Sequence, residues 1–313
     1  MAMTTRPALR SLAVSVGTAL IVTGALAAKP TRLVQRTFAS PKEAADALLA
    51  AAEKFDLTAL KEILGPEGID LVVTEDAVQD RNQATAWAAK AREKLTLVPD
   101  PQDQNSVTLN VGADDWPLPI PIVEDGKTWR FDVLAGREEV FLGRVGQNEL
   151  DAIAACRGYV DAQHEYAQRK HDGALVNQYA QPIISTPGRQ DGLVWRNADG
   201  TLGGPIAEGI ARAIAEGYRD KYEPYHGYYF KVLKGQGPHA QLGEMDFAVQ
   251  GAMIGGFALV AAPADYEKTG VKTFIVSHDG VVYEKDLGPA TLAAFKAMER
   301  FDPDPSWSPV QEP

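Results

Sequence analysis

The segment from Tyr222 to Phe230 combines a histidine with an aromatic density far above the 8% of the whole chain. Aromatic faces stack on ligand rings, and tyrosine hydroxyls add hydrogen bonds. The segment therefore fits a binding surface for a sugar or a peptide. The alternation also fits a strand entering a core, with Tyr228 and Phe230 on one face and Tyr229 on the other. The strand is the simpler interpretation.

A second group of candidate residues lies in a long loop-rich stretch, 171–226, which is interrupted by turn residues. Loops of this length are usually functional or disordered, and aromatic residues argue against disorder. We therefore expect the segment 185–230 to carry the binding activity. The candidate binding residues combine charge with aromatic surface: Arg189, Asp191, Trp195, Tyr225 and His226.

The same segment allows an enzyme as the alternative. Asp191, His226 and Tyr225 would supply a carboxylate, an imidazole and a phenol for hydrolysis of a wall or extracellular polymer. This hypothesis requires Asp191 and His226 to meet in one concave pocket. If the two residues belong to separate turns, the hydrolase hypothesis fails.

The spacing of the remaining reactive residues does not indicate metal or cofactor chemistry. None of the five histidines forms an HxH, HxxxH or HExxH pair. The Asp-Gly pairs at 191, 199 and 279 do not follow the calcium-loop pattern and are interpreted as turns. Cys156 lies in an apolar helical pattern with Leu150, Ile153 and Val160, which predicts one buried helix face and favours a buried packing thiol. We expect no cofactor and no metal.

The first 28 residues have the pattern of an export signal. Arg6 and Arg10 precede an uncharged run at 12–26, and Ala25-Leu26-Ala27 provides a small-x-small cleavage site. The run is shorter than the roughly 20 residues of a membrane span, so cleavage is favoured over an uncleaved anchor. We predict a signal peptide at 1–28, a periplasmic or secreted protein, and no membrane span after cleavage.

The composition limits the partners of the mature protein. The formal net charge of the full chain is −11, and loss of Arg6 and Arg10 with the signal peptide makes it −13; this acidic balance without a basic run argues against nucleic acid and anionic membrane surfaces. With Cys156 as the single cysteine, no intrachain disulfide can form. Core packing alone must therefore stabilise the exported chain.

Hydrophobic periodicity predicts an α+β chain with two domains. The segment 38–137 contains three helical patterns, at about 41–52, 56–64 and 76–94, followed by short strands and an Asp-Gly hairpin turn at 125–126. Gly136 is predicted to begin the second unit, with a long helix at 147–169. Helix, loop and strand patterns then complete a domain at 144–300, before a loose proline-rich tail at 301–313.

Eight sequence segments resemble the bacterial, exported family named domain of unknown function 2950. They include GADDWPLPIPIV at 112–123, STPGRQDGLVW at 185–195, EPYHGYYFKVLKGQGP at 223–238 and GVKTFIVSHDGVVYEKDLG at 270–288. The resemblance covers nearly the whole mature chain. The family name implies no function, and it transfers no site residue.

Two fold resemblances are weaker. The helix-then-sheet order of 38–137, with KTWRFD at 127–132, resembles the NTF2-like cone fold. The helix NELDAIAACRGYVDAQHEYA and the strands after it resemble the soluble part of pilins and pseudopilins, without their hydrophobic anchor half. Both folds commonly serve as interaction modules. We therefore expect a non-enzymatic cell-envelope protein whose partner is an unknown envelope protein or polymer.

Overall fold

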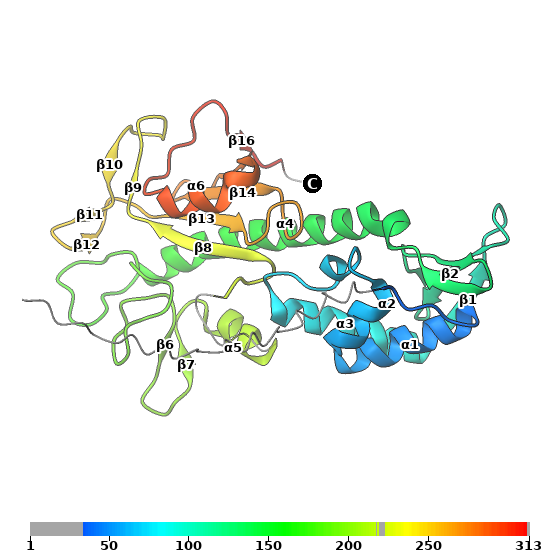
Figure 1. Ribbon diagram of the computed structural model, residues 1–313. Helices are drawn as coiled ribbons and strands as arrows, with labels where there is room; N and C mark the ends of the chain where they lie inside the picture. The colour runs from blue at the N-terminus through cyan, green and yellow to red at the C-terminus, as the bar shows by residue number, and fades with distance from the viewer. Residues whose placement is uncertain (1–33, 217, 219–222, 312–313) are drawn as a thin grey trace, which may run out of the picture. The chain divides into compact units, whose positions relative to one another are not determined.

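The computed structural model describes residues 34–216, 218 and 223–311 (Figure 1). The predicted signal peptide at 1–28 and Tyr222 lie outside these residues. The described chain combines helices with antiparallel sheets, so the predicted α+β class is confirmed. Among its helices, none has both the length and the apolar character needed to cross a bilayer.

Three helices open the described chain, and a side chain caps the start of each. They are α1 (Pro41–Lys54), α2 (Leu57–Leu64) and α3 (Ala77–Glu93), with a short 3-10 turn, η1 (Ile69–Leu71), before α3. Ser40 accepts a hydrogen bond of 3.2 Å from the Glu43 backbone N–H, and Asp56 and Asp76 cap the next two helices. Such caps satisfy N–H groups that the first turn leaves free. The three predicted helices are confirmed.

A five-stranded antiparallel sheet follows the helices. Its strands are β1 (Leu95–Pro99), β2 (Ser106–Val111), β3 (Trp116–Pro117), β4 (Ile122–Asp125) and β5 (Thr128–Phe131). They pair in the order β1-β2-β4-β5, and β3 pairs with β2. Gly126 adopts a φ of 70° in the turn from β4 to β5, as the Asp-Gly signal predicted.

The helix α4 (Val133–Tyr166) has 34 residues and starts well before the predicted position at 147. Gly136, the predicted start of a new unit, lies inside this helix. The predicted helix start was wrong because the glycines at 136, 143 and 146 lower the helix propensity of this segment, and tertiary packing overrides that local preference. A Cβ at Gly136 would lie 2.2 Å from the Pro119 carbonyl oxygen, so the close packing there requires glycine.

The second sheet pairs its strands in the order β16-β15-β14-β13-β8. These are β8 (Tyr228–Leu233), β13 (Ala258–Pro263), β14 (Lys272–Ser277), β15 (Val282–Asp286) and β16 (Ser308–Pro309). Every residue of β13 is buried, although successive side chains point to opposite faces. Both faces are therefore covered: α4 packs on β13 and β14, and α6 (Thr291–Ala297), after the 3-10 turn η2 (Gly288–Ala290), packs on β13 (Figure 1).

The apolar stripe predicted for α4 was partly wrong. Cys156 and Val160 are buried against the second sheet, but Leu150 is 61% exposed. At 3.6 residues per turn, Leu150 lies about 200° around the axis from buried Ala152, on the opposite side of the helix. The Cys156 thiol is buried as predicted, and desolvation raises its pKa to about 12.

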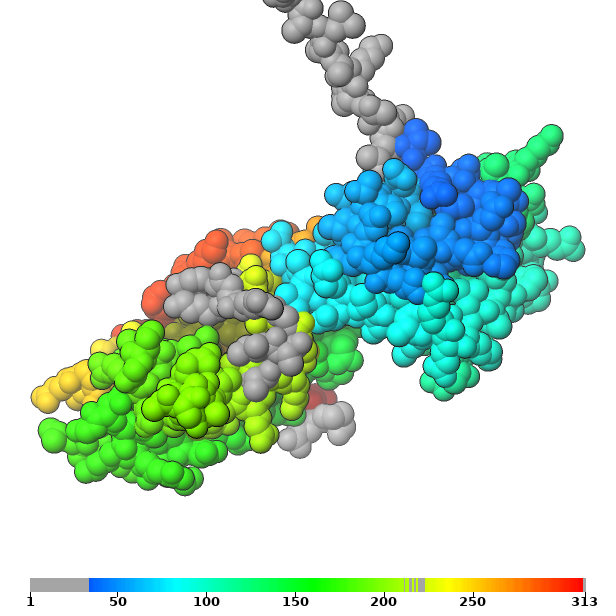
Figure 2. Space-filling view, turned by 90° about the horizontal axis from the view of Figure 1, so that it is seen from below, coloured from blue at the N-terminus to red at the C-terminus, as the bar shows by residue number. Residues whose placement is uncertain are grey.

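The stretch between α4 and β8 is loop-rich, and its described residues contain short elements at the surface (light green in Figure 2). They are β6 (Trp195–Arg196), β7 (Leu202–Gly203) and α5 (Ala207–Glu216). Two further short pairs precede β13: β9 (Gly235–Gln236) with β10 (Met245–Asp246), and β11 (Ala248–Val249) with β12 (Ala252–Met253).

The tail at 301–313 was predicted to be loose, but two buried side chains and one short strand anchor its described part. Phe301 and Trp307 are buried, and β16 pairs with β15. The prolines in this segment suggested a solvated tail, whereas the two aromatic side chains gain more by burial.

Two clusters of buried apolar side chains form the cores. The first joins α1–α3 to the first sheet, and the second joins α4 and α6 to the second sheet. The helix α4 contributes Val133 to the first cluster and Cys156 to the second. The division into domains at 38–137 and 144–300 stays a prediction, and so do the NTF2-like and pilin-like resemblances.

Candidate functional site

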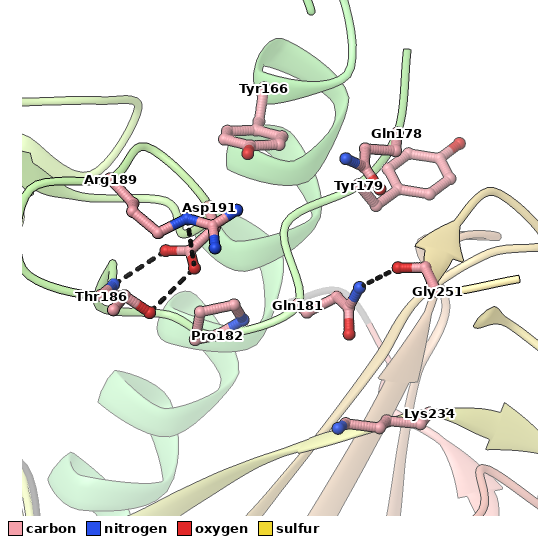
Figure 3. Close-up of a pocket in the computed structure, with 10 residues that line it drawn as sticks. All are labelled: Tyr166, Gln178, Tyr179, Gln181, Pro182, Thr186, Arg189, Asp191, Lys234 and Gly251. Atoms are coloured by element: carbon pink, nitrogen blue, oxygen red, sulfur yellow. Dashed lines mark hydrogen bonds and ion pairs between the residues drawn. The ribbon is translucent and has the colours of Figure 1, made fainter. Parts of the chain in front are cut away.

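The loop-rich stretch borders a cavity of about 470 Å³ (Figure 3). This volume is in the range of roughly 300–1,000 Å³ that small-molecule sites occupy. The lining comes from the end of α4, from the loop, and from the side of the second sheet: Tyr166, Gln178, Tyr179, Gln181, Pro182, Thr186, Arg189, Asp191, Lys234 and Gly251. All of them except Pro182 and Gly251 carry a side-chain hydrogen-bonding group. Such a lining favours a polar ligand.

Two of the candidate residues from the sequence, Arg189 and Asp191, line this cavity. Asp191 accepts hydrogen bonds from the backbone N–H and the hydroxyl of Thr186, both at 2.8 Å. Burial by itself raises the pKa of Asp191, but the bonds from Thr186 and the charge of Arg189 outweigh it, so the pKa lies below its ordinary value. Arg189 Nε lies 3.5 Å from Asp172 and 3.6 Å from Asp191. This part of the lining is an ion-paired group in which two carboxylates more than neutralise the single guanidinium.

The opposite part of the lining comes from the residues that follow β8 and β11. The Lys234 side chain is exposed, and no described residue pairs with its ammonium group. Gln181 Nε2 donates a 2.7 Å hydrogen bond to the Gly251 carbonyl, which ties the loop to the β11–β12 turn. Figure 3 shows Lys234 and Arg189 on different sides of the cavity.

Trp195, a third candidate, lies behind the cavity lining. The Tyr166 ring stacks on His171 with centroids 3.9 Å apart, and the Trp195 ring lies 5.6 Å from His171. The Tyr166 hydroxyl donates to the Gln190 carbonyl at 2.5 Å, and burial raises the Tyr166 pKa to about 12. Trp195 therefore packs against His171, and His171 in turn stacks on the lining residue Tyr166.

The last two candidates, Tyr225 and His226, belong to a separate cluster. The His226 Nδ1 lies 2.7 Å from Asp151 Oδ2 on α4, and its Nε2 lies 3.4 Å from Glu216 Oε2 at the end of α5. The Tyr225 ring stacks on the imidazole with centroids 4.2 Å apart. His226 has a φ of 48°, a conformation that residues other than glycine seldom adopt.

A buried carboxylate holds this cluster against α3. Asp76 Oδ2 accepts hydrogen bonds of 2.9 Å from the Tyr218 hydroxyl and from the Gly227 backbone N–H. The Tyr218 oxygen in turn accepts the His226 backbone N–H at 3.3 Å. These bonds fix the left-handed turn at His226, so the turn is built into the fold.

The structure separates the pair that the hydrolase hypothesis requires. Asp191 is held within its own turn by Thr186, whereas Asp151 and Glu216 hold His226. Within the described ranges, no hydrogen bond, ion pair or ring contact joins Asp191 to His226. The same ranges contain no group of three His, Cys, Asp or Glu side chains placed for a metal ion.

Several residues at the two sites were missed by sequence reasoning. Lys234, Gln178 and Tyr166 line the cavity, and Asp151 pairs with His226. The position of Lys234 directly after an aromatic strand was the one available signal. Gln178, Tyr166 and Asp151 belong to no local motif, and tertiary packing alone brings them to these sites.

Comparison with curated proteins finds no match, and neither does comparison with solved structures. A family model, however, matches residues 35–310, which include both cores, the cavity and the His226 cluster. The segments that resemble this family in the sequence therefore belong to one continuous match. The chain is a member of the family described as protein of unknown function (DUF2950).

Proposed function

We propose that this protein is an exported, non-enzymatic module of the cell envelope that binds a small polar ligand in the cavity beside the loop-rich stretch. The observation that carries the proposal is the cavity itself, of about 470 Å³ and with a mainly polar lining. Export to the periplasm or the exterior is part of the proposal and is supported by the charge and apolar pattern of 1–28.

Binding accounts for the cavity better than hydrolysis does. A general acid or base works best with a pKa near the operating pH. Asp191 has its pKa shifted downward, and Thr186 and Arg189 hold it in place. His226 lies in another cluster, so Asp191 has no imidazole partner among the residues described. The cavity groups are suited to hydrogen bonding and charge pairing.

The ligand is expected to be presented by an envelope polymer or an envelope protein. The test is saturation-transfer NMR on the chain without its signal peptide, against neutral sugars, acidic sugars and short peptides. At least one class should show saturable binding. A Gln178→Trp variant, which places an indole in the cavity, should abolish that binding.

The matched control is Asn177→Trp, because Asn177 is the exposed neighbour of Gln178 and does not line the cavity. This variant should bind as the unmodified protein does. The proposal is wrong if none of the three classes binds, or if Gln178→Trp leaves the affinity unchanged.

A further inference from the structure

Lys234 has a fixed backbone and an unpaired side chain. Its carbonyl oxygen accepts a 2.9 Å hydrogen bond from the Phe247 backbone N–H, and the preceding residue, Leu233, is 1% exposed at the end of β8. The ammonium group nevertheless has no hydrogen-bonding or ionic partner among the described residues. The fold therefore holds an uncompensated positive charge at the cavity.

Arg189, the second cation at the cavity, differs from Lys234 because it has carboxylate partners within the protein. Carboxylates of both Asp172 and Asp191 lie near Arg189 Nε, at 3.5 and 3.6 Å, so the Arg189 charge is already neutralised within the protein and this group has a net negative charge. Of the two cations that line the cavity, Lys234 is therefore the one without a carboxylate partner among the described residues. A ligand anion would find its charge partner in Lys234.

The other polar side chains of the lining indicate which groups the rest of the ligand carries. Gln178 has no hydrogen bond to the described residues, and Gln181 uses its Nε2 but keeps its Oε1 free. Two side-chain amides with open donors and acceptors match the hydroxyl groups of a sugar. Among the described lining residues Pro182 is the one aliphatic side chain, and the Tyr166 and Tyr179 rings are the other apolar surfaces, so the lining is mainly polar.

We propose that the cavity binds a saccharide that carries a carboxylate, with the carboxylate on Lys234 and the sugar hydroxyls on Gln178 and Gln181. This inference rests on the proposed binding function and names its ligand class. The charge pair is partly exposed to solvent, so the binding should weaken as the salt concentration rises.

The test uses ligand pairs that differ in their charge. Glucuronate is compared with glucuronamide, and N-acetylmuramate with the carboxamide of N-acetylmuramic acid, by saturation-transfer titration of the chain without its signal peptide. The first pair represents acidic extracellular polysaccharides and the second represents the wall. At least one acid should bind about tenfold more tightly than its neutral counterpart.

Variants of Lys234 assign the charge pair to this residue. Lys234→Gln should reduce the affinity for the acid about tenfold and leave the affinity for the neutral sugar unchanged, whereas Lys234→Arg should retain most of the binding. Lys127→Gln is the control, because it makes the same change in net charge at an exposed residue in the turn after β4.

The outcomes separate this inference from the proposed function. Equal binding of acids and neutral sugars, with no effect of Lys234→Gln, would overturn the acidic-saccharide inference and leave the binding function intact. If a peptide binds, no saccharide binds, and Gln178→Trp blocks the peptide, the acidic-saccharide inference is likewise wrong and the binding function stands. If nothing binds in the cavity, both are wrong.

Discussion

Asp76 accepts a hydrogen bond of 2.9 Å from the hydroxyl of Tyr218, which lies 142 residues later in the chain. Both side chains are buried, at 1% and 8% exposed. The same carboxylate oxygen accepts the Gly227 backbone N–H at 2.9 Å. Because a buried carboxylate needs such partners, these bonds specify how the chain enters β8 after the loop-rich stretch.

We predict that Gly227→Ala strongly destabilises the protein. Gly227 has a φ of 75°, and a Cβ there would lie 2.5 Å from Asn148 Nδ2, within a buried amide that bonds Gln79 and the Thr269 carbonyl. Chemical denaturation should show a loss of roughly 3 kcal/mol or more in the free energy of unfolding.

The control for this prediction is Gly126→Ala. Gly126 has a similar φ, 70°, but open space around the position of a Cβ. Gly126→Ala should lower the free energy of unfolding by about 1 kcal/mol, because only backbone strain opposes it. Equal losses in the two variants would mean that the Asn148 contact has no steric consequence.

Asp80 should make the stability depend on pH. It is 5% exposed, and burial raises its pKa from 3.8 to about 6, although bonds from Thr74 and the charge of Arg144 oppose the shift. Between these two pKa values the native state binds the proton more tightly than the unfolded state, so stability falls as pH rises from about 4 to 6.

In Asp80→Asn, the decrease in the free energy of unfolding between about pH 4 and 6 should be smaller by about 2–3 kcal/mol. Urea unfolding at several pH values measures this difference. Asp161→Asn, at an exposed position on α4, is the control and should leave the slope unchanged. A slope in Asp80→Asn equal to that of the unmodified protein would exclude Asp80 as its source.

The orientation of α4 predicts losses of stability of different size for two apolar residues three positions apart. Ile153 packs on the second core, so Ile153→Asp should cost about 2–4 kcal/mol, because it buries a charge without a partner. Leu150 is 61% exposed, and Leu150→Asp should cost less than about 0.5 kcal/mol. Similar melting temperatures for the two variants would contradict this orientation.

The double variant Tyr225→Ala with His226→Ala tests the remaining sequence candidates. Without the imidazole, the carboxylates of Asp151 and Glu216 lose their shared partner, so stability should fall by about 1–3 kcal/mol. Ligand binding in the cavity should stay unchanged once the variant is folded. A loss of binding at constant melting temperature would instead support the sequence hypothesis that both residues bind the ligand.

Export is tested at the N-terminus of the mature protein. Sequencing of protein from the extracytoplasmic fraction should begin at Ala28 or Lys29, because the site at Ala25-Leu26-Ala27 follows the apolar run. A product that still starts at Met1 would contradict the prediction.

The sequence by itself determined where helices begin and where hairpins turn, because caps and turn residues act on neighbouring residues. Ser40 and Asp56 start their helices, and Gly126 and Gly280 form hairpin turns with φ of 70° and 79°. These interactions span one to four residues, so they can be predicted from neighbouring residues in the sequence. The sequence also determined that Cys156 is buried, because its apolar neighbours recur at helical spacing.

Tertiary structure decided the features that depend on long-range contacts. The exposure of Leu150 follows from which face of α4 meets the second sheet, and the glycines near the start of α4 concealed where the helix begins. The cavity brings together residues from Tyr166 to Gly251, and among the sequence candidates it takes Arg189 and Asp191 but not His226. Such proximity arises from packing between distant segments, which local spacing does not encode.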